Sequence, residues 1–356
     1  MDDGASHTSR NPRGIAAAIR RAGPCPALLL LLVCWIVSLP LACLFGPVPL
    51  HWEQVLQGIL GRLGLAPCPE QLLTVVGDIR LARVVLAALI GGALAVAGVA
   101  LQGVLHNPLA DPFTLGVSAG AACGASLAIA LGGAAGAALG ISSHAALISM
   151  AALAGALLAL FGALLLGGGG LERVVLAGIA VSAFLGSIVA LVKALHEDSV
   201  TSIVFWILGS FQGRGWDSLP VLLATLLPGM AVVALLWRGL DALSLGEEAA
   251  SHVGLAVGRT RLLLLAGAGC MTAGCVAVAG IVGFVGLVAP HALRQTLGPA
   301  HGPLIAGAFL GGGLLLVWAD VLARTLPGSG QELPVGVVTA LLGAPVFALM
   351  VRARHA

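Results

Sequence analysis

Charge is scarce in this sequence: aspartate, glutamate, lysine and arginine together make up 9% of its 356 residues. A soluble domain carries roughly 25% charged residues. Hydrophobic residues reach 59%. This balance excludes an ordinary soluble protein. In a bilayer the backbone polar groups must be satisfied within helices, because hydrocarbon offers no hydrogen-bond partners. The composition therefore predicts an all-α, polytopic membrane protein.

Lysine is almost absent, with a single copy at Lys193 that is followed by Ala-Leu. A nucleotide-binding P-loop needs a glycine-rich loop that ends in Gly-Lys-Ser or Gly-Lys-Thr. The chain has no such motif, so we predict that this polypeptide does not hydrolyse ATP and is not itself an enzyme.

Acidic residues are missing from the centres of the apolar runs. Asp320 comes closest, but it stands near one end of its run, and Arg324 is spaced four residues away for a local ion pair. A carrier driven by ion gradients needs an ionisable group near mid-membrane. The sequence therefore favours a drive supplied by another subunit. An ion-coupled secondary transporter that works alone and a membrane scaffold without a transport role are the alternatives.

Three further absences narrow the function. There is no basic patch with interleaved aromatic residues, which argues against nucleic-acid binding. No histidine–cysteine cluster has metal-ligand spacing, so we predict no bound metal and no other cofactor. The seven cysteines are scattered singly, which is typical of small hydrophobic side chains in a core rather than of a disulfide framework.

What the sequence has instead is a series of long apolar runs, typical of transmembrane helices. Glycine, with 51 copies, allows such helices to approach closely, for example at Gly91, Gly98 and Gly312. We place the break between the seventh and eighth runs near Gly280. The ten predicted spans are 26–46, 81–105, 113–133, 144–166, 173–194, 218–238, 262–280, 281–297, 303–322 and 334–351.

These runs divide the chain into a polar N-terminal tail, 1–25, and a transmembrane domain, 26–353, with a long polar loop at 240–261. Ten spans put both termini on the same side of the membrane. If that side is the cytoplasm, 11 of the 17 lysine and arginine residues lie on inner segments and six on outer ones. This bias favours cytoplasmic termini.

Three segments are predicted not to span the membrane. Residues 51–65 read as a short amphipathic segment on the outer side, and 196–216 as an outer re-entrant or interfacial stretch anchored by Trp206 and Trp216. In the polar inner loop, Ser244 followed three residues later by Glu247 predicts a capping box that opens a short helix.

The motifs of the chain, taken in order, resemble a known family. The segments that carry the resemblance are RLAR (80–83), QGVLHNPLADPFTLGVSAGA (102–121), VLAGIAVSA (175–183), FWILGSFQGRGW (205–216), LGEEAASHVGL (245–255), GIVGFVGLVAPHALR (280–294), ADVLART (319–325) and ELPVGVVTALLGAPVFALM (332–350). Over residues 50–353 the chain is similar to permeases of the FecCD/BtuC-type ABC importers. The family usually has proline between the two arginines of its first motif, where this chain has Ala82.

The resemblance implies a BtuC-like permease of about ten transmembrane helices that forms a homodimer. Separate ATPase subunits bind it in the cytoplasm and a periplasmic substrate-binding protein docks outside. The transported substrate would be an iron chelate (ferric siderophore or haem), with cobalamin as the alternative. The expected location is the bacterial inner membrane.

Three sets of site residues follow from the resemblance. Arg80, Arg83 and Arg324 are expected to pair with carboxylates of the binding protein, because the planar guanidinium binds carboxylates bidentately. The alternative is that these side chains are interfacial anchors. The second set would form the coupling helix that contacts the ATPase: Leu245, Gly246, Glu247, Glu248, Ala249, Ala250, His252 and Gly254.

The third set is the proline-bracketed turn that begins at Asn107. Its residues Asn107, Pro108 and Leu109 are expected to close the inner end of the pathway. The alternative is a simple helix-breaking turn, in which asparagine and proline serve only turn chemistry.

Overall fold

The computed structural model describes residues 23–139, 143–168, 170–327 and 331–352, and within these ranges the chain is helical and contains no strand. The predicted tail, 1–25, lies almost wholly outside the described residues. The elements are α2 (Pro24–Leu44), α3 (Trp52–Arg62), α4 (Glu70–Leu72), the π-helix η1 (Leu73–Arg80), α5 (Leu81–Val104), η2 (Pro112–Leu115), α6 (Val117–Leu139), α7 (His144–Gly167), α8 (Leu171–Leu195), η3 (Glu197–Ser199), α9 (Val200–Ile207), η4 (Trp216–Ser218), α10 (Leu219–Leu235), α11 (Trp237–Leu243), α12 (Glu247–His252), α13 (Val257–Ala279), α14 (Val285–Leu297), α15 (His301–Thr325) and α16 (Val335–Arg352).

Seven of the described helical segments are long and apolar enough to cross a membrane: those containing α2, α5, α7, α8, α10, α13 and α15. The other three predicted spans correspond to α6, α14 and α16. The 13 residues of α14 are too few to cross the bilayer as a helix. The predicted span 281–297 begins four residues before α14, because 281–284 form a non-helical segment. The predicted break is confirmed, since α13 ends at Ala279 and Gly280 has a positive φ of 72°.

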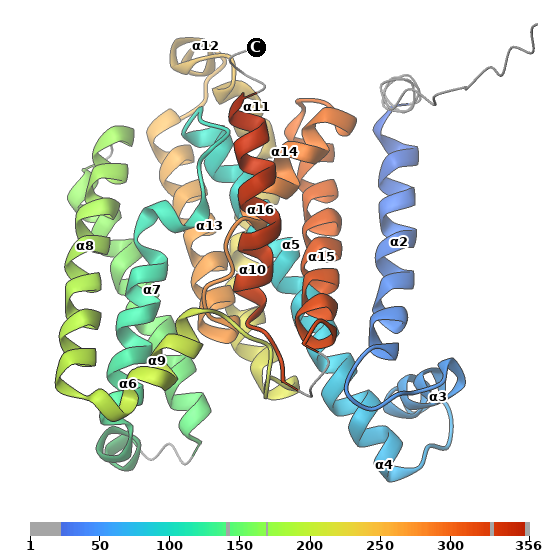
Figure 1. The fold of residues 1–356 in the computed structure, drawn as a ribbon. Coiled ribbons are helices and arrows are strands. Elements are labelled where there is room, and N and C mark those ends of the chain that lie inside the picture. The colour runs from blue at the N-terminus through green and yellow to red at the C-terminus, as the bar shows by residue number, and fades with distance from the viewer. Residues whose placement is uncertain (1–22, 140–142, 169, 328–330, 353–356) are drawn as a thin grey trace, which may run out of the picture.

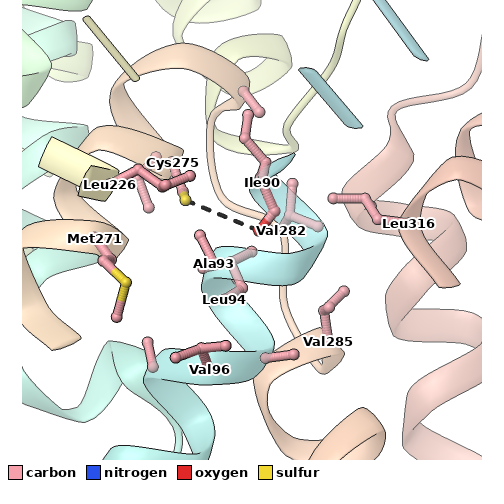
Figure 2. Close-up of a cluster of buried hydrophobic side chains, with 14 of the residues drawn as sticks. Ile90, Ala93, Leu94, Val96, Leu226, Met271, Cys275, Val282, Val285 and Leu316 are labelled. Atoms are coloured by element: carbon pink, nitrogen blue, oxygen red, sulfur yellow. Dashed lines mark hydrogen bonds between the residues drawn. The ribbon is translucent and has the colours of Figure 1, made fainter. Parts of the chain in front are cut away.

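Helix α5 occupies the centre of the bundle, packed against α13, α14 and α15 (Figure 1). Its side chains are buried along nearly its whole length. Figure 2 shows Ile90, Ala93 and Leu94 of α5 beside Met271 and Cys275 of α13. A helix that is apolar on all sides is stable only where other helices surround it, which is the environment that α5 occupies.

Glycine allows the neighbouring backbones to touch α5. A Cβ atom at Gly91 would lie 2.2 Å from the carbonyl oxygen of Gly312 on α15, and one at Gly98 would lie 1.8 Å from that of Gly286 on α14. Both distances are far inside van der Waals contact. The close approaches predicted at Gly91 and Gly98 are confirmed.

The bundle has two ends, which we name by the short helices that mark them in Figure 1: the α12 end and the α3 end. Helix α2 begins at the α12 end and α16 also finishes there (Figure 1). The start of the first described helix and the end of the last therefore lie at the same end of the bundle.

The structure tests the three segments predicted not to span. Residues 51–65 contain the 11-residue helix α3, and 196–216 contain the eight-residue helix α9, both too short to span the membrane. The capping box at Ser244 is wrong. Helix α12 begins at Glu247 after Gly246, and the Ser244 hydroxyl instead donates a hydrogen bond of 2.6 Å to the carbonyl of Asp241, at the end of the preceding helix.

The tight contact at Gly98 gives a testable expectation. Gly98→Ala should lower the midpoint of thermal unfolding in detergent, because the methyl group forces α5 and α14 apart; overpacking of this kind costs about 1–3 kcal/mol. The matched control is Gly162→Ala on α7, where no atom lies within 4 Å of the added methyl group. Equal midpoints for the two variants would contradict this account of the α5–α14 contact.

Candidate functional site

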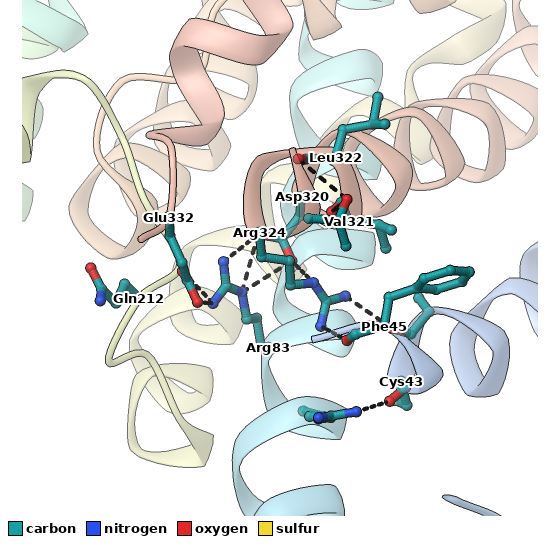
Figure 3. Close-up of polar contacts among 12 residues, drawn as sticks. Cys43, Phe45, Arg83, Gln212, Asp320, Val321, Leu322, Arg324 and Glu332 are labelled. Atoms are coloured by element: carbon teal, nitrogen blue, oxygen red, sulfur yellow. Dashed lines mark hydrogen bonds and ion pairs between the residues drawn. The ribbon is translucent and has the colours of Figure 1, made fainter. Parts of the chain in front are cut away.

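Three arginines at the α3 end, Arg80, Arg83 and Arg324, form a buried cluster that we call the arginine cluster. Arg83 lies between two carboxylates from distant parts of the chain, as Figure 3 shows. Its Nη2 is 2.8 Å from Oδ1 of Asp320, and its Nη1 is 2.8 Å from Oε2 of Glu332. Oδ2 of Asp320 also lies 3.4 Å from Nε of Arg324, one helical turn away, and this ion pair confirms the predicted local pair.

The other two arginines bind main-chain carbonyls at the end of α2. Arg80 donates hydrogen bonds to the carbonyls of Cys43, Leu44 and Val48. Arg324 donates to those of Phe45 and Ala42, at 3.0 and 3.1 Å. The last carbonyls of a helix have no partner within it and carry partial negative charge. The two guanidinium groups therefore satisfy these carbonyls and fasten α2 to the bundle.

All three arginine residues of the cluster are largely buried, with exposed fractions of 5%, 8% and 7% for Arg80, Arg83 and Arg324. The sequence placed them correctly near helix ends, but it gave no sign of Glu332 or of the α2 carbonyls as partners. Within the chain, Arg83 and Arg324 share the carboxylates of Asp320 and Glu332, and Arg80 is held by main-chain carbonyls.

The predicted coupling residues, 245–254, form α12 and the turns on either side of it, and α11 directly precedes them at the α12 end (Figure 1). Leu245 and Val253 flank α12 and are 76% and 74% exposed. Glu248, Ala249, His252 and Gly254 are exposed as well, whereas Ala250 is buried within the chain. The segment therefore presents a surface of mixed apolar and acidic character, with Ala250 as its internal contact.

One ion pair and a pair of hydrogen bonds fasten this segment to the long helices. Glu247 lies 2.6 Å from Nη2 of Arg261 on α13. The hydrogen bond from Arg261, together with its charge, lowers the pKa of Glu247 below its usual range, so the carboxylate is ionised at neutral pH. Asp241 on α11 accepts hydrogen bonds from the backbone N–H and ring Nδ1 of His301, at 2.9 and 2.7 Å, where α15 begins.

The turn predicted as a gate also lies near the α12 end. The backbone N–H of Leu109 donates to the side-chain oxygen of Asn107 at 3.0 Å, and that of Ala110 donates to the Asn107 carbonyl. Asp111 then caps η2 through the N–H of Phe113. Asn107 is exposed and Leu109 is partly exposed. The turn is thus compact and held by its own polar groups.

A large apolar cavity of about 550 Å³ opens between α6, α7 and α8. Small residues such as Gly120, Gly124 and Gly155 line it, together with leucines and Phe184. The lining offers dispersion contacts and no charge. Within the described ranges, no three His, Cys, Asp or Glu residues converge as metal ligands would.

This combination of a helical bundle with helices long and apolar enough to cross a membrane, a buried arginine cluster at one end and an exposed short helix at the other defines a polytopic membrane protein. The model of the FecCD transport family matches residues 30–353. The chain belongs to this family.

Relatives and a solved structure support the assignment. The chain is 39% identical to the cobalamin import system permease protein BtuC of Halobacterium salinarum, over 81% of the chain and 76% of that protein. It is 40% identical to the hemin transport system permease protein HmuU of Yersinia pestis, over 76% of the chain and 80% of that protein. A structure described as an inward-facing conformation of a putative metal-chelate type ABC transporter matches with a TM-score of 0.80 and 28% identity, covering 92% and 99% of the two chains.

Proposed function

We propose that the chain is the membrane permease of an ATP-driven importer that takes up a ferric siderophore or haem. The family match over residues 30–353 is the observation that carries this proposal. The absence of a P-loop motif from the sequence supports ATP hydrolysis by separate subunits. A periplasmic binding protein would deliver the substrate to the α3 end.

The substrate class rests on chemistry shared among the relatives. The hemin permease and the cobalamin permease match this chain at nearly equal identity, 40% and 39%. Identity alone does not separate them, so cobalamin is the alternative substrate. All three candidates are bulky metal complexes, and a wide pathway lined by small apolar groups suits such cargo better than a tight polar pocket.

We assign ATPase contact to the α12 segment. Leu245 and Val253 expose two large apolar side chains on either side of a short helix, and such exposed groups are typical of a protein interface. Glu247 and Glu248 are both exposed, and Glu247 is also paired with Arg261 of the same chain. The segment can therefore seat in a groove of a partner without losing its own attachment to α13.

We assign docking of the binding protein to the arginine cluster. Arg83 carries two carboxylate partners, and one of them, Glu332, comes from the segment between α15 and α16. A carboxylate of the binding protein could take the place of Glu332 on the guanidinium fork, because the bidentate geometry is the same. Docking would then be an exchange of partners rather than the pairing of a free charge.

We place the homodimer axis near the 107–112 turn, with Asn107, Pro108 and Leu109 closing the pathway at its inner end. Helices α8 and α16 present exposed leucines, which is compatible with a subunit interface as well as with contact to lipid. The α12 end is then cytoplasmic, which puts both termini inside, and the location is the bacterial inner membrane.

The first test concerns the source of energy. In proteoliposomes, uptake of haem or ferric siderophore should require the ATPase subunits and ATP. Replacing Glu247 and Glu248 together by Arg should leave the permease folded but abolish ATP-dependent uptake, because α12 loses its internal ion pair and its exposed charge is reversed. Uptake by the permease alone, driven by a proton or sodium gradient, would instead establish a secondary transporter.

The second test concerns docking. Glu332→Gln removes the carboxylate that competes for Arg83 while Asp320 remains, so affinity for the binding protein should rise by about fivefold, equivalent to roughly 1 kcal/mol. The control is Glu53→Gln, which removes an exposed charge on α3. Binding measured at low salt should separate the two variants. Equal affinities would assign the cluster to fastening α2 alone.

The third test concerns the inner gate. With the seven native cysteines replaced, Leu109→Cys should cross-link between the two subunits when the inner end is closed. Trapping the complex with ATP and vanadate should change the yield, because alternating access opens and closes this end. An active dimer that never cross-links at position 109 would remove the turn from the axis.

A further inference from the structure

His106 stands between the end of α5 and the 107–112 turn, and its ring reaches across to the coupling segment. Ring nitrogen Nε2 lies 2.7 Å from the carbonyl oxygen of Leu243, the last residue of α11. A carbonyl oxygen can only accept a hydrogen bond, so Nε2 carries the hydrogen. Leu243 precedes the start of α12 by four residues. The side chain therefore joins the turn to the base of the coupling helix.

The backbone of His106 is unusual. Its φ is 49°, and among the described residues only Phe284 shares a positive φ outside glycine. Residues with a Cβ rarely adopt this left-handed conformation, because it is sterically unfavourable. The conformation directs the chain out of α5 into the turn. A bond from the ring to Leu243 stabilises a geometry that the backbone alone does not favour.

Beyond His106, the turn is connected to α8 by direct backbone contact. Hydrogen bonds from Leu109 to Asn107 and from Phe113 to Asp111 hold it together as far as η2. A Cβ atom at Gly178 on α8 would lie 2.5 Å from the carbonyl oxygen of Thr114 in η2. Because the two backbones are in contact here, a displacement of the turn toward α8 would push η2 against that helix.

On the other side of the bond, α11 and α12 are attached to the long helices. Asp241 binds His301 at the start of α15, and Glu247 binds Arg261 near the start of α13. These pairs make the coupling segment a unit that moves with the helices it touches. The bond from His106 brings the turn into the same unit.

We propose that His106 is a positioning residue that transmits movement of the coupling helix to the 107–112 turn and, through η2, to α8. This rests on the proposed role of α12 in ATPase contact. The step is a displacement carried by one hydrogen bond, in which the Leu243 carbonyl moves with α11 and the His106 ring follows it.

The experiment uses the full complex with its ATPase subunits in lipid nanodiscs. With the native cysteines replaced, Leu109→Cys is labelled with a polar maleimide, without nucleotide and after trapping with ATP and vanadate. This readout needs no knowledge of the transported substrate. ATP hydrolysis is measured on the same preparations before trapping. A failure of α12 to engage the ATPase then appears separately, as lost hydrolysis in the protein that keeps His106.

His106→Gly is the decisive variant, because glycine adopts a φ of 49° without strain and only the ring is lost. Its hydrolysis should persist, while the nucleotide-dependent change in labelling rate should fall by about two- to tenfold, the range expected for one hydrogen bond. His106→Gln should restore the change, since its amide donates at similar reach. The control Thr296→Ala removes a hydroxyl that bonds only within its own helix, to Leu293, and should have no effect.

Three results would overturn the proposal. A full labelling change in His106→Gly would show that movement reaches the turn by another route. Equal loss of hydrolysis and labelling change in that variant would assign His106 to folding or assembly. A glutamine variant that behaves like glycine would show that the bond to the Leu243 carbonyl is not what matters.

Discussion

The close packing around α5 is the constraint on which the rest of the structure depends. Backbone contacts at Gly91 and Gly98 leave no room for side chains to rearrange between α5 and its neighbours. The helix is therefore a fixed axis that joins two polar sites. Arg80 and Arg83 lie at one end of it, and His106 follows the other. A change at either site must be accommodated by the surrounding helices, since α5 itself cannot repack.

The two ends handle charge in different ways. At the α3 end the arginine cluster is buried, and its guanidinium groups are bound by Asp320, Glu332 and the carbonyls of α2. Removing one member of such a buried set leaves an unpaired charge, which is strongly unfavourable. At the α12 end the ion pair of Glu247 is exposed on the carboxylate side, where water screens it. The buried arginine cluster suits a firm attachment of α2 to the bundle. The exposed Glu247–Arg261 pair suits a surface that a partner protein covers.

Prediction from the sequence succeeded where the physical cause is local. The apolar runs, the break at Gly280 and the Asp320–Arg324 pair depend on neighbours within a few residues, and the structure confirms them. The capping box at Ser244 was wrong because α11 continues to Leu243, so that hydroxyl serves the end of one helix instead of the start of the next. The pairing of Arg83 with Glu332 spans 249 positions, and no local pattern announces it.

The sequence by itself therefore determined the class of protein, the positions of the apolar runs and the absence of a P-loop. The hydrophobicity and length of a run, and the presence of a motif, are properties of short segments. Only the tertiary structure decided which groups the arginines bind, which face of α12 is exposed and that His106 reaches Leu243 across 137 positions. Contacts of this kind depend on how helices pack in three dimensions. In this chain the helices pack where glycines let two backbones approach each other, and the sequence does not specify which helix each glycine will face.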